Sequence, residues 1–119
     1  MVQSMKFVSA TVKPFKLDEI LEALARVGIQ TPTVTETKVY GQKGPTEIYR
    51  GTEFTMNFVP MLKIETAVPS DQIEKVTTAI ADAARTGQIG GGEIFVFDLE
   101  LGQRIGVGQV NEKQPRHAA

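Results

Sequence analysis

The spacing of hydrophobic residues along the chain predicts four strands and two helices. Short runs rich in β-branched or aromatic residues are typical of strands, and they occupy residues 6–12, 32–40, 60–68 and 93–99. Two segments between these runs carry apolar residues at helical spacing. The helical stripes are Leu17, Ile20, Leu21, Leu24 and Val27 in the first segment, and Ile73, Val76, Ile80 and either Ala83 or Ala84 in the second. Gly28 is expected to end the first helix, and Ser70 or Asp71 to cap the second.

The order strand, helix, strand, strand, helix, strand predicts an α+β fold, the ferredoxin-like βαββαβ sandwich. In this fold both helices cover the same face of the sheet. The last strand nevertheless has apolar side chains on both faces, because Phe95, Phe97 and Leu99 alternate with Ile94 and Val96. A second apolar face in so small a domain predicts self-association.

The segment 41–57 has no hydrophobic period and contains several glycines. It is long for a connection inside a compact domain, and such loops usually serve a function. Residues 1–108 are expected to form one domain, and residues 109–119 a polar, flexible tail. Met5 is an alternative to Met1 as the native start.

Composition narrows the possible chemistry. The chain has 119 residues, a formal net charge of −1, no cysteine and a single histidine, His117, in the predicted tail. These features exclude a disulfide framework, a thiolate metal site and a cysteine nucleophile, and they predict no binding to nucleic acid. Because no apolar leader or membrane-length run is present, a cytoplasmic location without membrane insertion is expected.

Candidate chemistry is limited to glycines and surface carboxylates. Pairs such as Glu19 and Glu22 fall on predicted helix surfaces, where a solvated face explains them, so an enzyme is the weaker hypothesis. The run Gly90-Gly91-Gly92 has two interpretations. It is either a plain turn or a set of backbone N–H groups that hold phosphate oxygens.

Three separated blocks of the sequence resemble the PII signal transduction proteins. They recur in order over about residues 5–108. The blocks are Lys13-Pro14-Phe15-Lys16-Leu17 with Val34-Thr35-Glu36, Gln42-Lys43-Gly44 with Thr46-Glu47-Ile48-Tyr49-Arg50-Gly51, and Ala84-Arg85-Thr86-Gly87 with Ile94-Phe95-Val96-Phe97-Asp98. The resemblance implies a homotrimer that binds adenine nucleotides between subunits. Its long T-loop, here about residues 41–57, would dock on a transporter, an enzyme or a regulator.

The resemblance also assigns roles to individual residues. Adenine recognition falls on Glu65, Thr66 and Ala67 of one subunit with Thr33 of the next, and the nucleotide passes Val39, Tyr40 and Gly41 at the loop base. Phosphates are expected against Gly90, Gly91 and Gly92, with Arg104 reaching in from the neighbouring subunit. Gln42 and Lys43 complete the expected nucleotide-binding residues. Gln42 also matches the Mg²⁺ ligand of the ATP-bound state and is the one expected metal contact.

Several positions depart from the family pattern. The arginine before Gln42 is absent, the glycine-loop lysine is Glu93, the second carboxy-terminal arginine is Gly106, and the lysine that pairs with 2-oxoglutarate is Met61. The commonly uridylylated tyrosine is Phe54. These changes predict that ADP or AMP is preferred over ATP. They resemble the branch associated with carboxysomes and inorganic carbon, for which bicarbonate is the second effector, expected near Gln42 and Lys43.

Besides a purely structural trimer, which is favoured only if no nucleotide binds, two alternatives remain at the level of sequence. One is a conventional regulator of nitrogen metabolism that senses ATP and 2-oxoglutarate, which Met61 and Glu93 disfavour. The other is a ferredoxin-like enzyme, since this fold hosts many chemistries. The expected protein is a non-enzymatic regulator.

Overall fold

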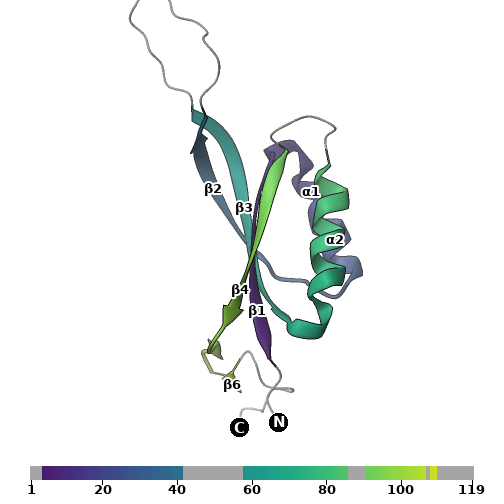
Figure 1. Cartoon of the computed structure of the whole chain (residues 1–119), viewed down its shortest axis with the longest axis vertical. Helices are drawn as coiled ribbons and strands as arrows, with labels where there is room; N and C mark the ends of the chain where they lie inside the picture. The colour runs from purple at the N-terminus through teal and green to yellow at the C-terminus, as the bar shows by residue number, and fades with distance from the viewer. Residues whose placement is uncertain (1–3, 42–57, 86–90, 107, 110–119) are drawn as a thin grey trace, which may run out of the picture.

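The structure is a computed structural model that describes residues 4–41, 58–85, 91–106 and 108–109. Within these residues, a four-stranded sheet carries two helices on one face (Figure 1). The elements in chain order are β1 (Met5–Val12), the 3-10 turn η1 (Pro14–Lys16), α1 (Leu17–Arg26), β2 (Thr33–Tyr40), β3 (Phe58–Pro69), the 3-10 turn η2 (Ser70–Gln72), α2 (Ile73–Ala84), β4 (Gly92–Leu99) and the short pair β5 (Gln103–Arg104) and β6 (Gly108–Gln109).

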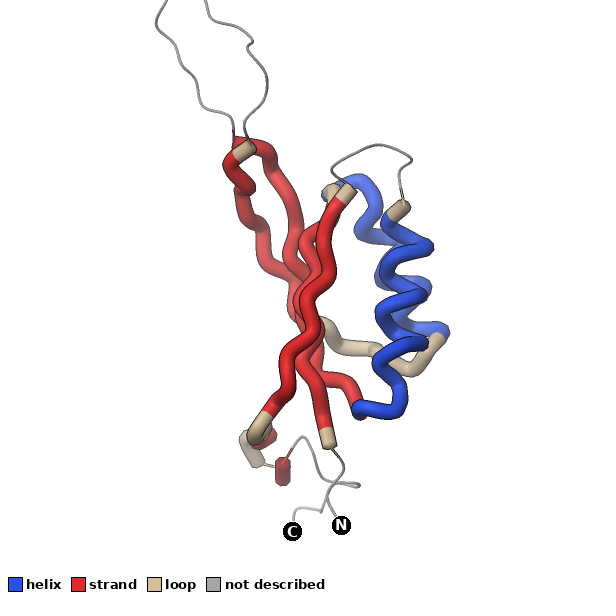
Figure 2. The backbone as a smooth tube through the Cα atoms, in the orientation of Figure 1, coloured by secondary structure: helices blue, strands red, loops and turns tan. Residues whose placement is uncertain are grey.

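The sheet has the strand order β2-β3-β1-β4, and all its neighbouring strands are antiparallel. The two helices lie together against one face, and none of the described residues covers the opposite face (Figure 2). This arrangement confirms the predicted βαββαβ sandwich. The strands β2 and β4 form the two edges of the sheet.

The core lies between the sheet and the helices. Alternate residues of the central strands β1 and β3 point into it, and both helical stripes meet them. The side chains with less than 2% exposure are Val8, Val12, Ile20, Leu24, Ile64, Val68, Val76 and Ile80. The predicted apolar stripes of α1 and α2 are therefore confirmed as the faces that form this core, except at Leu21, which is half-buried and lines a groove outside it.

The end of α1 follows the prediction. Gly28 has a φ of 92°, in the left-handed region that favours glycine. Its N–H bonds to the carbonyl of Ala25, and the N–H of Ile29 bonds to the carbonyl of Leu24 at 2.9 Å. This pair of hydrogen bonds is a Schellman motif, which satisfies carbonyls left free at a helix end.

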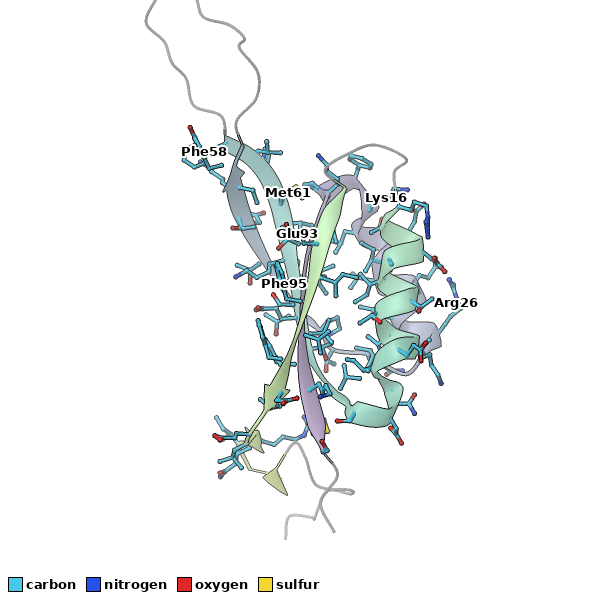
Figure 3. The ribbon with its side chains drawn as sticks, viewed as in Figure 1. Lys16, Arg26, Phe58, Met61, Glu93 and Phe95 are labelled. Atoms are coloured by element: carbon cyan, nitrogen blue, oxygen red, sulfur yellow. The ribbon has the colours of Figure 1, made fainter. Side chains whose placement is uncertain are left out.

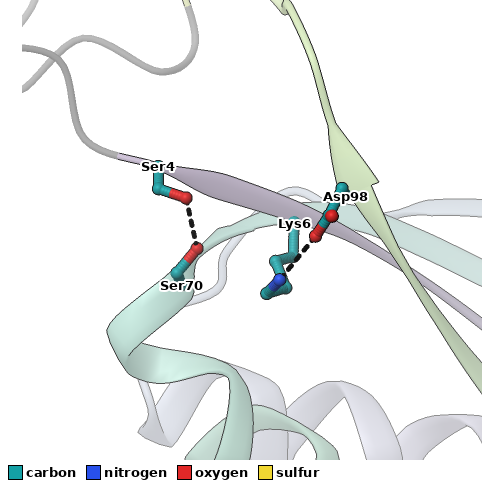
Figure 4. A network of polar contacts seen from close by, with 4 residues as sticks. All are labelled: Ser4, Lys6, Ser70 and Asp98. Carbon is teal, nitrogen blue, oxygen red and sulfur yellow. Dashed lines mark hydrogen bonds and ion pairs between the residues drawn. The ribbon is translucent and has the colours of Figure 1, made fainter.

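The predicted cap of the second helix is wrong. The N-cap residues are instead Pro69 for η2 and Gln72 for α2, because the chain enters the helix through a 3-10 turn, and neither of these two side chains makes a capping hydrogen bond. The Ser70 hydroxyl is instead hydrogen-bonded to the Ser4 hydroxyl at 2.9 Å (Figure 4), and its N–H bonds to the Ser4 carbonyl. Ser70 thus joins the start of α2 to the start of β1.

The edge strand β2 is more exposed than the sequence suggests. The alternation in residues 32–40 predicts one wet face, but seven of the eight residues of β2 are exposed and the eighth is half-buried. The reason is the strand order, because β2 pairs with β3 only and projects beyond the helix layer.

Among the described residues, no helix is long and apolar enough to cross a membrane.

Candidate functional site

The sheet face opposite the helices carries the candidate residues Thr33, Glu65 and Ala67. The register places Phe7 opposite both Ala67 and Phe97 on this face. The rings of Phe7 and Phe97 stack with centroids 6.5 Å apart. Phe95 and Phe97 are each about half exposed, at 51% and 53%. The expected second apolar face is therefore present and is uncovered in a single chain.

Glu65 lies at the centre of a polar row across this face. Its cross-strand neighbours are Thr33 on β2 and Ser9 on β1. The Ser9 hydroxyl donates a hydrogen bond of 3.0 Å to Glu65 Oε2. The register thus brings Thr33 and Glu65 together within one chain, without a second subunit. Ser9 has no candidate role in the sequence, because its contact depends on pairing between residues 56 positions apart.

The two residues after Glu65 lie on opposite faces of β3. Thr66 pairs with the buried Val8 on the helix side, and its hydroxyl donates to the Ala67 carbonyl at 3.4 Å. Ala67 lies on the uncovered face opposite Phe7. Only Glu65 and Ala67 of this predicted trio therefore present side chains to the uncovered face.

The base of the long loop is an aromatic pair. Tyr40 ends β2 opposite Phe58, and their rings meet edge to face with centroids 5.4 Å apart. Val39 and Tyr40 are exposed, and Gly41 follows directly. Gln42, Lys43 and Phe54 lie outside the described residues.

The glycine segment leads into β4 at the end of the sheet where β1 finishes. Gly92 pairs with Val12 and has a φ of 141°. A β-carbon on Gly92 would collide with the carbonyl oxygen of Thr11, so this glycine is required by a close backbone approach. Gly91 precedes it, and Gly90 lies outside the described residues.

Arg104 lies at the other end of the sheet. The strand β4 runs from Gly92, opposite Val12, to Leu99, opposite Met5, and Arg104 follows in β5 (Figure 1). Eight strand residues span about 25 Å at roughly 3.3 Å each. A single chain therefore does not bring Arg104 to its own glycine segment, and a shared site for the two needs a second copy.

The structure describes three of the positions that depart from the family pattern, Met61, Glu93 and Gly106. Met61 is only 6% exposed, so its side chain is packed away from solvent (Figure 3). Glu93 is exposed at the start of β4, opposite Thr11, and directly follows the glycines. Gly106, after β5, has a φ of 90°. Where the family pattern has three cations, this chain presents a buried thioether, a carboxylate and a glycine.

Two other features lie apart from these residues. The Lys6 ammonium pairs with Asp98 at 2.5 Å on the helix side of the sheet (Figure 4), and its hydrogen bond and charge lower the pKa of that carboxyl below its ordinary value. A largely apolar groove of about 450 Å³ contains none of the candidate residues. It is lined by Leu21, Ala25, Ile29, Gln30, Thr31, Pro32 and Val34.

Metal binding has no support from side-chain clusters in the part of the chain that the structure describes. No group of three or more His, Cys, Asp or Glu residues is close enough there to hold an ion. The single predicted metal contact, Gln42, lies outside that part.

Comparison with known proteins shows the family. The family model "Nitrogen regulatory protein P-II" matches residues 5–109. A protein named nitrogen regulatory protein P-II from Rhizobium etli is 54% identical over 110 residues, covering 92% of this chain and 98% of the relative. The nitrogen regulatory protein GlnK of Escherichia coli K12 is 48% identical over 109 residues, covering 91% and 97%.

A solved structure has the same fold. It is the Arabidopsis thaliana PII protein bound to citrate, with a TM-score of 0.70 and 29% identity, covering 98% of this chain and 94% of that one. The sequence blocks, the βαββαβ topology and these matches agree over nearly the whole chain. The chain belongs to the PII family of nitrogen regulatory signalling proteins.

Proposed function

We propose that this protein is a non-enzymatic homotrimeric regulator that binds ADP or AMP more tightly than ATP in the clefts between subunits. It controls a partner protein through the loop at residues 41–57. The adenine base lies at Glu65, Thr66, Ala67 and Thr33, and the nucleotide passes Val39, Tyr40 and Gly41. The phosphates lie against Gly90, Gly91 and Gly92.

The trimer is supported by two features of the single chain. Phe95 and Phe97 are half exposed on a sheet face that none of the described residues covers. Arg104 stands about a full strand length from the glycine segment, so it reaches a phosphate there only from another copy.

The trimer is tested by Phe97→Glu, which places a charge on the uncovered face. Light scattering is expected to give three times the chain mass for the wild type and a lower mass for Phe97→Glu. Phe15→Glu is the matched control, because Phe15 is 73% exposed in η1 and outside that face. A wild-type monomer would contradict the trimer and the shared site.

The nucleotide preference rests on the loss of two cations, a glycine-loop lysine that is Glu93 here and an arginine that is Gly106 here. A hydrogen bond to a charged group contributes about 1.5–3 kcal/mol, so loss of two such contacts weakens binding of the outer phosphates about a hundredfold or more. Glu93 adds repulsion, because it is exposed next to the glycines. ADP and AMP place fewer phosphate groups in this region, so the missing cations reduce their binding free energy less than that of ATP.

Isothermal titration calorimetry tests this preference directly. The wild-type protein is titrated with ADP, AMP and ATP under the same conditions, with and without bicarbonate. We expect the dissociation constants of ADP and AMP to be lower than that of ATP. Bicarbonate is the proposed second effector, bound near Gln42 and Lys43 at the loop base, and its affinity is then coupled reciprocally to that of the nucleotide.

A second candidate function is a conventional sensor of ATP and 2-oxoglutarate. The identity of 54% to a nitrogen regulatory P-II protein favours it. The buried Met61 and the exposed Glu93 disfavour it, because neither side chain offers a cation to an anionic ligand.

A further inference from the structure

The hydrogen bond between Ser9 and Glu65 joins the two central strands on the uncovered face. Ser9 Oγ donates to Glu65 Oε2 at 3.0 Å, and the two residues are direct cross-strand partners. Side chains in such pairs start from β-carbons only about 5 Å apart, so a serine hydroxyl reaches a glutamate without distortion. The contact fixes one oxygen of a flexible side chain that otherwise has considerable rotamer freedom.

The position of Ser9 in the sheet allows it to restrict the orientation of the Glu65 carboxylate. It lies on β1, which is paired on both sides, with β3 and with β4. It is half-buried, and Glu65 is half-buried beside it. Thr33, the other hydroxyl residue opposite Glu65, stands on the edge strand β2 and is exposed. The row therefore has one hydroxyl committed to the carboxylate and a second one open toward solvent.

A fixed carboxylate distinguishes purine bases by the groups at their 6-position. An ionised carboxylate only accepts hydrogen bonds. The 6-amino group of adenine donates one, whereas the 6-oxo group of hypoxanthine or guanine only accepts. With Oε2 held by Ser9, the remaining oxygen faces either a donor, which is favourable, or a second acceptor, which is repulsive. A carboxylate without this restraint can turn toward the N1–H of a 6-oxopurine and accept from it.

We infer that Ser9 is a positioning residue that orients the Glu65 carboxylate and thereby sets the preference for 6-aminopurine over 6-oxopurine nucleotides. This inference rests on the proposed function, since it takes Glu65 to be the contact to the base. Ser9 itself touches Glu65 and acts on the ligand only through that side chain.

The test compares ADP with inosine 5′-diphosphate, which differs from it in the 6-substituent and the adjacent N1–H. Calorimetry gives the ratio of the two dissociation constants for the wild type, Ser9→Ala, Ser9→Cys and Ser9→Thr. We expect the preference of the wild type for ADP to fall about tenfold in Ser9→Ala, the size of one charge-assisted hydrogen bond. Ser9→Cys, with a weakly donating thiol, behaves in the same way, and Ser9→Thr keeps the preference because it keeps the hydroxyl.

Ser70→Ala is the matched control, because it also removes one serine hydroxyl from a hydrogen bond of 2.9 Å, at the far end of β1. It is expected to leave the ratio unchanged, and an equal fall in this variant would overturn the inference. If the wild type binds ADP and Ser9→Ala retains the full preference, the positioning role of Ser9 is wrong and the proposed function stands. If the wild type does not bind ADP, both are wrong.

Discussion

Gly92 lies so close to Thr11 that no side chain fits between them. A β-carbon built on Gly92 would collide with the carbonyl oxygen of Thr11, the residue before its strand partner Val12. The third glycine of the run therefore has a structural reason that is independent of any ligand. The glycine at position 92 is therefore explained by this contact without the proposed phosphate-binding role.

Gly92→Ala is expected to destabilise the fold more than Gly28→Ala. Both glycines have a positive φ, but an alanine at position 28 meets nothing within 4 Å. Gly28→Ala should cost about 1 kcal/mol from backbone strain alone, and Gly92→Ala about 1–3 kcal/mol more from the added clash. Urea unfolding measures the difference. Equal midpoints for the two variants would contradict the close approach.

The sequence predicts the elements better than their contacts. Periodicity locates the core residues Ile20 and Ile64, because burial imposes spacings of 3.6 and 2 on helices and strands. The Ser9–Glu65 contact is not predictable in this way, since it depends on the register between distant strands. The prediction of a cap at Ser70 is wrong for a similar reason, because the Ser70 hydroxyl is hydrogen-bonded to Ser4, which is distant in sequence.

The arrangement of the candidate site residues in space is also only partly predictable from the sequence. Residues of one strand, such as Glu65 and Ala67, are expected to share a face from their spacing of two. The position of Arg104 relative to the glycines follows only from the observed direction and length of β4. The solvent exposure of the edge strand β2 likewise follows from the strand order, which is a property of the whole sheet.

The Lys6–Asp98 pair gives a pH dependence with a defined sign. The folded pKa of Asp98 lies below its unfolded value of about 4. The contribution of the pair is therefore present above that unfolded value and is lost as the pH falls through the lowered folded pKa. The effect on stability is small, because the Asp98 side chain is 89% exposed.

An NMR titration of the Asp98 carboxyl carbon measures this shift. Lys6→Met is expected to raise the pKa of Asp98 toward its ordinary value. Lys75→Met, which removes an exposed lysine from α2, serves as the control and should leave that pKa unchanged. An Asp98 pKa that is the same in Lys6→Met and in the wild type would show that the pair does not form in solution.

Glu93→Lys tests the electrostatic reason for the nucleotide preference. The change restores a cation beside the glycine segment, so it should raise the affinity for ATP more than that for AMP. One charge-assisted contact corresponds to about a tenfold gain or more for ATP. Glu22→Lys makes the same change of charge on the exposed side of α1 and controls for net charge. Equal gains for ATP and AMP would mean that position 93 does not face the outer phosphates.

Mixed trimers test whether the site is shared between subunits. Glu65→Ala and Arg104→Ala are each expected to weaken ADP binding about tenfold or more, while Arg26→Ala on α1 leaves it unchanged. When the two weakened chains are refolded together in equal amounts, about a quarter of the clefts should pair an intact Glu65 with an intact Arg104. Calorimetry should then detect a fraction of tight sites. Failure to recover any tight site would place both residues in the same subunit's site or outside it.

The proposed function requires that this PII protein responds to ADP or AMP and not to ATP with 2-oxoglutarate. The most direct measurement is a parallel calorimetric titration of the wild-type protein with ADP alone and with ATP, Mg²⁺ and 2-oxoglutarate together. The buried Met61 and the exposed Glu93 predict tighter binding of ADP, and no enhancement of ATP binding by 2-oxoglutarate. Tighter binding of ATP in the presence of Mg²⁺ and 2-oxoglutarate than of ADP would contradict the account and make this chain a conventional nitrogen sensor.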